Sequence, residues 1–182
     1  MNSLTIQIGN MKRVLPLIKG EGVSYYFFNM LGDVELNKES AKALAKKVIK
    51  DSDVIVTIET KAIALVEELS KLLNQPRYVV VRKNKKAYMS NEVTVQGKTI
   101  ISGEVDYYID GHDIEYLKGK RVIVIDDVIS TCGTIDAVYR ILEKSNIKIL
   151  QFGCVLTEGE RRKEYRDIPL ISLDHIPLIK NN

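Results

Sequence analysis

Two adjacent acids and a hydroxyl-rich loop follow one apolar segment of the chain. In VIVIDDVISTCGT, residues 122–134, four apolar residues lead into Asp126 and Asp127, and the tail STCGT opens a segment with helical spacing. Backbone N–H groups at a helix N-terminus, together with hydroxyls, favour a phosphate. Two carboxylates beside that phosphate would repel it, so the ligand should present sugar hydroxyls or a divalent cation to them. Ribose 5-phosphate has this order of groups.

Basic residues follow two other apolar segments and could hold a second anionic group. Lys61 comes after DVIVTI, and Arg82 and Lys83 come after YVVV. If these segments are neighbouring strands, their cations would receive an anion on the far side of the sugar. A sugar with a phosphate at one end and a pyrophosphate at the other matches this order of charges.

The elements that must position these residues alternate between two periodicities. Nearly continuous apolar runs, typical of strands covered on both faces, span residues 53–58, 77–82, 121–126 and 147–156. Apolar residues at helical spacing span residues 39–50, 61–73 and 133–144, with Asn37 as the expected cap of the first helix. This alternation predicts an α/β fold with a mainly parallel sheet flanked by helices. Ligands bind at the carboxyl ends of such strands, where the segments 59–62, 82–86 and 126–134 all fall.

The remaining segments predict a small hood and a loop. Residues 84–110 carry alternating stretches around an expected turn at Gln96-Gly97-Lys98, which indicates a hairpin or a long functional loop. Residues 1–36 and 157–182 flank a core of about residues 37–156 and are expected to form a hood over the strand ends. At 182 residues, the chain is expected to be a single domain.

The composition excludes several classes of protein. Hydrophobic residues make up 45% and charged residues 28%, which is typical of a globular protein and not of a disordered or collagen-like one. No apolar run approaches the ~18 residues of a membrane span, and the N-terminus lacks the plan of a signal peptide, so we expect a cytoplasmic protein without a membrane partner. Cys132 and Cys154, the two cysteines, suggest neither a zinc site nor a disulfide framework. The net charge of +3 gives no reason to expect nucleic acid, although RKNKK at 82–86 is basic.

These motifs together resemble the type I phosphoribosyltransferases. The signature of that family is an apolar strand, two acidic residues and a Thr-Gly-Gly-Thr-like loop that binds 5-phosphoribosyl 1-pyrophosphate; here these are VIVI, Asp126 with Asp127, and residues 130–134. VTIETKAIAL followed by VVVRK is similar to the purine salvage branch. EVDYYIDGHDIEYLKGKRV is similar to adenine and archaeal-type hypoxanthine phosphoribosyltransferases. The resemblance covers roughly residues 20–175.

The resemblance implies a purine phosphoribosyltransferase, in which pyrophosphate leaves C1 of the ribose and a purine nitrogen adds with inversion. It implies Mg²⁺ held mainly by the substrate, with Asp126 and Asp127 as candidate ligands, a water-excluding lid at residues 84–106, and a homodimer. The implied catalytic residues are Lys61, Arg82, Asp126 and Asp127. The implied contacts are Ser130, Thr131, Cys132, Gly133 and Thr134 to the 5-phosphate; Thr60, Lys61, Ala62, Arg82 and Lys83 to pyrophosphate; and Phe27 or Phe28 to the base.

Three residues depart from the family pattern. Cys132 stands where glycine is nearly always found, so it must adopt the loop conformation at a steric cost. A helix N-terminus would lower its thiol pKa and could make it redox-sensitive, although a tolerated small side chain is the simpler interpretation. Ala62 also replaces a usual glycine. Ser130 replaces an aspartate of the hypoxanthine-guanine enzymes, which favours the adenine, xanthine or archaeal-type branches. We expect adenine as the base first, then hypoxanthine or guanine, then xanthine.

Other interpretations of the same segments remain open. The aromatic run Tyr25–Phe28 would by default be core packing. VIVIDD could be a Walker B strand, but the nearest match to the required phosphate loop has Glu92 in place of its first glycine. A regulator could keep the phosphoribosyl pyrophosphate pocket as a sensor and bind nucleic acid, as the altered Cys132 and Ala62 would allow. The low net charge and the lack of a helix-turn-helix favour an enzyme.

Overall fold

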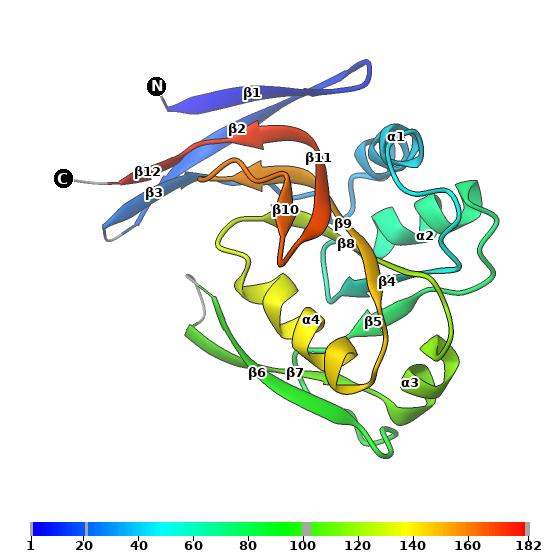
Figure 1. The fold of residues 1–182 in the computed structure, drawn as a ribbon. Coiled ribbons are helices and arrows are strands. Elements are labelled where there is room, and N and C mark those ends of the chain that lie inside the picture. The colour runs from blue at the N-terminus through cyan, green and yellow to red at the C-terminus, as the bar shows by residue number, and fades with distance from the viewer. Residues whose placement is uncertain (1, 21, 100–102, 181–182) are drawn as a thin grey trace.

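The computed structural model describes residues 2–20, 22–99 and 103–180, and its centre is a six-stranded sheet with the order β10-β11-β9-β8-β4-β5 (Figure 1). All neighbouring pairs are parallel except β10 with β11. The predicted α/β fold with a mainly parallel sheet is therefore confirmed. The strands are β4 (Val54–Ile58), β5 (Val79–Val81), β8 (Val122–Ile129), β9 (Ile149–Glu158), β10 (Glu164–Tyr165) and β11 (Ile168–Ile176).

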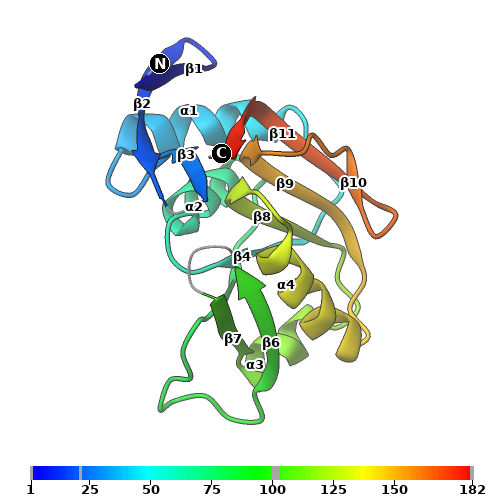
Figure 2. The ribbon, with the colours of Figure 1, turned by 90° about the vertical axis from the view of Figure 1, so that its left-hand side faces the viewer.

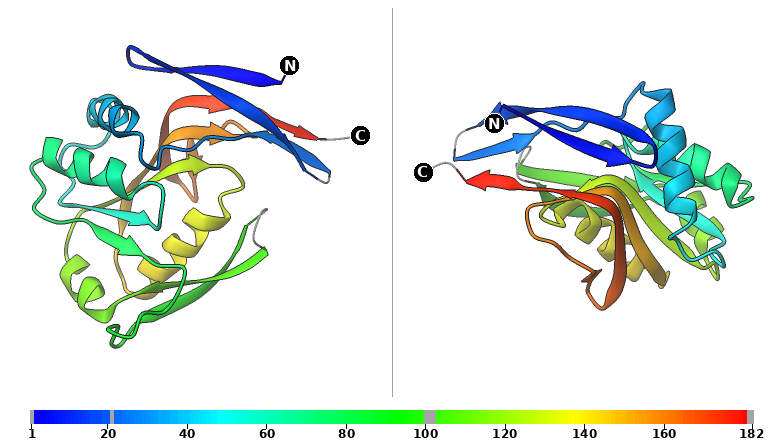
Figure 3. Two further views of the ribbon diagram at one scale, coloured as in Figure 1. Left: turned by 180° about the vertical axis from the view of Figure 1, so that it is seen from behind. Right: turned by 90° about the horizontal axis from the view of Figure 1, so that it is seen from above.

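Two hydrophobic cores enclose the central sheet, one on each face. Helices α1 (Val34–Ala45) and α2 (Ile63–Leu72) cover one face, and α3 (Gly111–Leu117) and α4 (Gly133–Lys144) cover the other (Figure 3). Along β8, Val122 and Val124 pack with α4, whereas Ile123 and Ile125 pack with α2. Burial on both faces explains why the strands are continuous apolar runs, and it leaves charged residues room only at the strand ends. No helix in the described part of the chain is both long and apolar enough to cross a membrane.

Helix α4 has the predicted bounds, but α1 does not. Helix α1 begins at Val34, five residues before the predicted start. The polar stretch after Leu36 interrupts the apolar spacing, so the pattern does not indicate the first turns of this helix. Asp33 caps it by accepting a hydrogen bond from the Leu36 N–H group at 3.0 Å. The predicted cap, Asn37, is wrong: it lies inside the helix and donates to the carbonyl oxygens of Met30 at 2.7 Å and Asp33 at 2.8 Å.

A second, antiparallel sheet forms from both terminal segments and has the order β1-β2-β3-β12. Its strands are β1 (Ser3–Ile8), β2 (Met11–Lys19), β3 (Val23–Tyr26) and β12 (Leu178–Lys180). We call it the hood sheet. The prediction that all of residues 157–182 belong to the hood is wrong, because β11 lies in the central sheet beside β9. Its sequence, IPLISLDHI, contains proline and polar residues and lacks the apolar continuity of the other strands.

The hairpin of β6 (Val93–Thr99) and β7 (Gly103–Ile109) packs against α4. It lies at the end of the molecule opposite the hood sheet (Figure 2). The predicted turn at Gln96-Gly97-Lys98 is wrong, since these residues pair within the hairpin. A Cβ at Gly97 would lie 2.7 Å from the Tyr107 ring and 3.0 Å from the Cβ of Ala137, so this glycine permits close packing. Of the predicted lid at 84–106, residues 100–102 lie outside the described residues.

Candidate functional site

The carboxyl ends of β4, β8 and β9 open into a cavity of about 730 Å³ beside the hood sheet. All three predicted site segments contribute to its wall. Of the predicted site residues, the wall includes Phe27, Phe28, Thr60, Lys61, Lys83, Asp126, Asp127, Ser130, Thr131, Cys132, Gly133 and Thr134. Ala62 and Arg82 do not line the cavity; Ala62 is fully buried at the start of α2, and Arg82 donates a hydrogen bond to Glu59, which does line it.

The loop from Ser130 to Thr134 joins β8 to α4 and presents the first turn of the helix to the cavity. Cys132 precedes the first helical residue, and its carbonyl oxygen accepts the Asp136 N–H at 2.8 Å. The N–H groups of the residues that precede Asp136 in this first turn have no such intrahelical partner, as at any helix start. Together with the hydroxyls of the loop, they form a cradle suited to a phosphate, as the sequence predicts.

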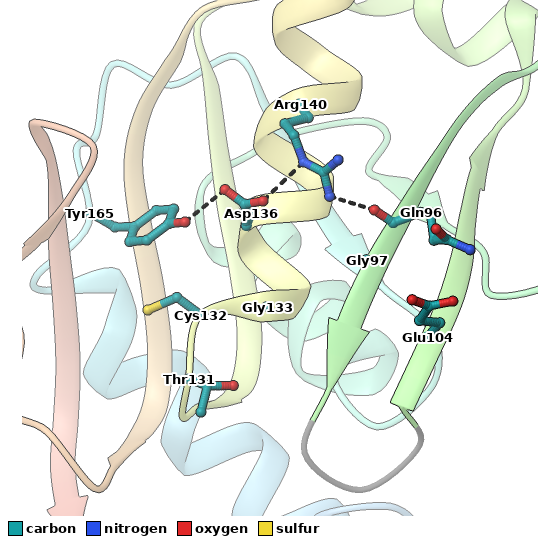
Figure 4. Close-up of a pocket in the computed structure, with 9 residues that line it drawn as sticks. All are labelled: Gln96, Gly97, Glu104, Thr131, Cys132, Gly133, Asp136, Arg140 and Tyr165. Atoms are coloured by element: carbon teal, nitrogen blue, oxygen red, sulfur yellow. Dashed lines mark hydrogen bonds and ion pairs between the residues drawn. The ribbon is translucent and has the colours of Figure 1, made fainter.

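Cys132 adopts the left-handed backbone conformation, with φ of +67°. This is the conformation in which glycine costs least, and the expected steric cost at Cys132 is therefore present. The side chain is 5% exposed and belongs to the core that contains α4. Burial raises the pKa of the Cys132 thiol, so the expectation of a lowered pKa is wrong. Cys132 also borders a smaller cavity of about 290 Å³ between α4 and the hairpin (Figure 4).

The two acids of β8 differ in their surroundings although both are buried. One carboxylate oxygen of Asp126 accepts the Asp127 N–H at 2.8 Å. Burial, together with the neighbouring charge of Asp127, holds the pKa of Asp126 well above its usual range. Asp127 instead forms an ion pair with Lys61, whose Nζ lies 2.5 Å from Oδ2.

Lys61 therefore joins two parts of the site that the sequence analysis treated separately. Its Nζ lies 2.5 Å from Asp127 and 3.4 Å from the carbonyl oxygen of Phe28. The residue predicted to receive a pyrophosphate is thus neutralised by a residue predicted to face the ribose. The signal available in the sequence was that both residues lie close to the carboxyl ends of strands, and β4 and β8 prove to be adjacent.

Glu59 organises the second group of cations; it belongs to the predicted site segment 59–62, but the sequence analysis assigned it no role of its own. Its Oε2 accepts a hydrogen bond from Arg82 at 3.1 Å, and its Oε1 accepts the Lys83 N–H at 3.2 Å. Arg82 also donates to the Tyr88 hydroxyl at 3.2 Å, and the Tyr88 and Glu59 contacts raise the pKa of Arg82. Arg82 acts from this position as a support for the β4–β5 edge, while Lys83 reaches the cavity.

The aromatic run of β3 and the following residues divides between packing and the cavity. Tyr26 and Phe28 are 7% and 4% exposed and belong to the core that contains α1 and α2, as the packing interpretation predicts. Phe27 is 45% exposed and lines the cavity. Of the two rings considered for base stacking, Phe27 is the more available to a ligand.

Glu158 is a further acid at the cavity that the sequence analysis missed, because it placed residue 158 in the hood. It is the last residue of β9 and is partly buried. Burial raises the pKa of Glu158, whereas a hydrogen bond with Ser130 and the charge of Lys61 oppose that rise. A carboxyl group thus lies directly beside the phosphate loop.

The protein's own donors do not form a closed metal site. Within residues 2–20, 22–99 and 103–180, no three His, Cys, Asp or Glu side chains are grouped to hold a metal ion. Asp126 and Asp127 remain as two buried carboxylates, and one of them is bound to Lys61. This donor set fits Mg²⁺ that keeps most of its ligands from a substrate and waters and takes one or two carboxylates from the protein.

Comparison with known proteins places these features in one family. The model of the phosphoribosyl transferase domain matches residues 29–180. The chain is 33% identical over 158 residues to the hypoxanthine/guanine phosphoribosyltransferase of Methanothermococcus okinawensis, covering 84% of this chain and 82% of that protein. It is 35% identical over 165 residues to the enzyme of the same name from Ferroglobus placidus, covering 87% of this chain and 83% of that protein.

Solved structures with the same fold carry a different name. The adenine phosphoribosyltransferase of Thermoanaerobacter pseudethanolicus superposes with a TM-score of 0.72 at 22% identity, covering 88% of this chain and 95% of that one. The adenine phosphoribosyltransferase of Giardia lamblia, solved with 9-deazaadenine, gives 0.67 at 18% identity, covering 95% and 93%. At these identities the likeness establishes the fold.

The buried charge of Asp126 should make stability depend on pH. Because its pKa is raised in the folded protein, ionising Asp126 costs folding free energy, and this cost grows as pH rises above the usual value of about 3.9. We expect Asp126→Asn to stabilise the ligand-free protein by on the order of 1–2 kcal/mol at pH 7–8, and the gain to vanish at about pH 3.5.

Urea unfolding at several pH values measures this gain. Asp127→Asn is the matched control, since it breaks the ion pair with Lys61 and should give no such stabilisation. Equal effects of the two substitutions at neutral pH would contradict the assignment of the raised pKa to Asp126.

The backbone of residue 132 can be tested by a pair of substitutions. Cys132→Ala and Cys132→Gly both remove the buried thiol, but only glycine relieves the left-handed conformation. We expect the free energy of unfolding of the glycine variant to exceed that of the alanine variant by about 1 kcal/mol, after allowing for the greater freedom of unfolded glycine. Chemical denaturation of both variants gives the difference, and an alanine variant at least as stable as the glycine variant would show that the loop is unstrained.

Proposed function

The chain belongs to the phosphoribosyl transferase domain family, and we propose that it is a purine phosphoribosyltransferase, which transfers the 5-phosphoribosyl group of phosphoribosyl pyrophosphate to a purine base. The observation that carries this proposal is the order of charges around the large cavity. The phosphate cradle lies at the start of α4, the buried acids Asp126 and Asp127 come next, and Lys61 and Lys83 lie toward β4 and β5. Phosphoribosyl pyrophosphate carries a phosphate, ribose hydroxyls and a pyrophosphate in the same order.

The residues of the cavity can each be given a role in this reaction. The loop from Ser130 to Thr134 binds the 5-phosphate through its N–H groups and hydroxyls. Asp126 and Asp127 accept hydrogen bonds from the ribose hydroxyls. Thr60, Lys61 and Lys83 receive the pyrophosphate, with Ala62 and Arg82 supporting the same turn from behind.

The chemical step breaks the bond between C1 of the ribose and the pyrophosphate oxygen and forms a bond from C1 to a purine nitrogen. The electron pair of the broken bond leaves with the pyrophosphate, and the purine nitrogen gives up its proton to the surroundings. Lys61 must exchange Asp127 for the leaving group, so its charge stabilises the pyrophosphate as negative charge develops there. The same exchange frees the Asp127 carboxylate for the sugar.

Mg²⁺ is the cofactor that this donor set fits. When bound, it would neutralise part of the charge on the pyrophosphate, with Asp126 and Asp127 as the protein carboxylates that would contact it or its waters. A homodimer remains a prediction of the family resemblance, and a cytoplasmic location remains a prediction of the apolar pattern of the sequence.

The base is proposed to be adenine. Ser130 stands in place of the aspartate of hypoxanthine-guanine enzymes, and Phe27 offers a partly exposed ring at the cavity. The named relatives at 33–35% identity are hypoxanthine/guanine phosphoribosyltransferases, which makes hypoxanthine or guanine the second candidate and leaves xanthine third.

Pyrophosphate release tests the proposed function. With phosphoribosyl pyrophosphate and Mg²⁺ present, we expect rapid release on addition of adenine, and slower release with hypoxanthine, guanine or xanthine supplied separately. The double variant Asp126→Asn, Asp127→Asn is the control, and it should lose turnover while keeping the fold, as checked by circular dichroism.

Two results would contradict the proposal in different ways. Full activity in the double variant would show that Asp126 and Asp127 do not belong to the catalytic site. If no pyrophosphate is released with any of the four bases, although calorimetry shows that the protein binds phosphoribosyl pyrophosphate, a non-enzymatic sensor would be favoured.

A further inference from the structure

Glu158 is a charged residue of the large cavity that the reaction described above does not use. The other charged side chains on the described wall have assigned partners or roles: Glu59 holds Arg82, Lys61 pairs with Asp127, and Lys83 and Asp126 face the substrate. A partly buried carboxyl group in a ligand cavity is costly unless something there uses it. Its position therefore indicates a contact with the ligand.

The backbone fixes Glu158 between the phosphate loop and the hood sheet. Its Cα pairs with that of Ile176 at the end of β11, and the following Gly159 donates its N–H to the Ile176 carbonyl oxygen at 3.0 Å. On the other side, the preceding Thr157 pairs with Ile129, the residue before Ser130 in the phosphate loop. The ribose side of the cavity thus lies on one side of this carboxyl group, and the strands of the hood sheet lie on the other.

The wall on the hood side is apolar and aromatic. It includes Ile176, Leu178, Tyr25 and Phe27, and Leu178 pairs with Tyr25 across β12 and β3. Such a wall suits the faces of a flat heteroaromatic ring. The carboxyl group at its border suits a polar atom on the edge of that ring.

The hydrogen-bonding capacity of Glu158 decides which polar atom that is. A carboxyl group has several acceptor positions. In its ionised form Glu158 has no donor of its own, so the position that faces the ring can only accept a hydrogen bond. A ring-bound amino group can donate to that position. A ring carbonyl oxygen in the same place would face the carboxylate oxygen of Glu158 as a second acceptor, with no proton between them.

Resting on the proposed function, we propose that Glu158 accepts a hydrogen bond from an exocyclic amino group of the purine, so that the cavity selects aminopurines over the corresponding oxopurines. Adenine and hypoxanthine differ in this way at C6, and guanine and xanthine differ in this way at C2. Glu158 is thus a residue that determines which base is used and has no part in the departure of pyrophosphate.

The substitution Glu158→Gln tests this role, because glutamine keeps the shape and also supplies an amide donor that can pair with a carbonyl oxygen. We measure kcat/KM for all four bases with wild type, Glu158→Gln and the control Glu164→Gln, whose exposed side chain lies on β10 outside the cavity. In Glu158→Gln we expect the ratio of adenine to hypoxanthine, or of guanine to xanthine, to fall by about 10- to 100-fold. The control should keep both ratios.

The outcomes separate this inference from the proposed function. Unchanged ratios in Glu158→Gln, a rise in either ratio, or an equal loss with all four bases would overturn the selection of an amino group. Absence of turnover by wild type with every base would overturn the proposed function instead. If Glu158→Gln does not fold, Glu158→Asp withdraws the carboxyl group by one methylene and should lower the same ratio, whereas an unchanged ratio there would also overturn the inference.

Discussion

The ion pair between Lys61 and Asp127 is the interaction on which the site depends. It joins the ends of β4 and β8, adjacent strands whose residues are far apart in sequence, and its nitrogen and oxygen are 2.5 Å apart. A buried carboxylate without a partner would be strongly destabilising, and Asp127 has this partner within the protein. The pair of Glu59 with Arg82 acts similarly at the next strand end. Because Lys61 is already neutralised by Asp127, a ligand must offer both an anion for Lys61 and hydrogen-bond donors for Asp127 to replace the pair favourably.

The parallel sheet explains why these charges meet. The strands β4, β5, β8 and β9 are buried on both faces, so their side chains are mostly apolar until near the strand ends. Parallel strands end at one edge of the sheet, and there the acids of β8, the cations after β4 and β5, and the carboxyl group of β9 converge. The hood sheet closes this edge with apolar residues from both terminal segments. Polar recognition of a sugar and apolar recognition of a ring therefore lie side by side in one cavity.

The sequence predicted best where one physical requirement dominates. The apolar run before Asp126 and the strong periodicity after Gly133 determine β8 and α4, and the bounds of α4 agree with the prediction. Prediction failed where tertiary packing overrides local pattern: Gly97 serves a close contact and not a turn, and β11 is mixed in composition yet lies in the central sheet. The raised thiol pKa of Cys132 follows from burial that spacing along the chain does not reveal. Glu158 was missed because its role depends on the position of β11 and the hood sheet.

The exchange of Lys61 from Asp127 to a pyrophosphate is the central claim, and calorimetric titration with two ligands tests it most directly. Phosphoribosyl pyrophosphate and ribose 5-phosphate share the phosphate and the sugar, and they differ in the group assigned to Lys61. With Mg²⁺ present, wild type should bind phosphoribosyl pyrophosphate more tightly than ribose 5-phosphate. In Lys61→Met this preference should largely disappear while ribose 5-phosphate still binds. A preference that survives in Lys61→Met would contradict the account, because the pyrophosphate would then be held without Lys61.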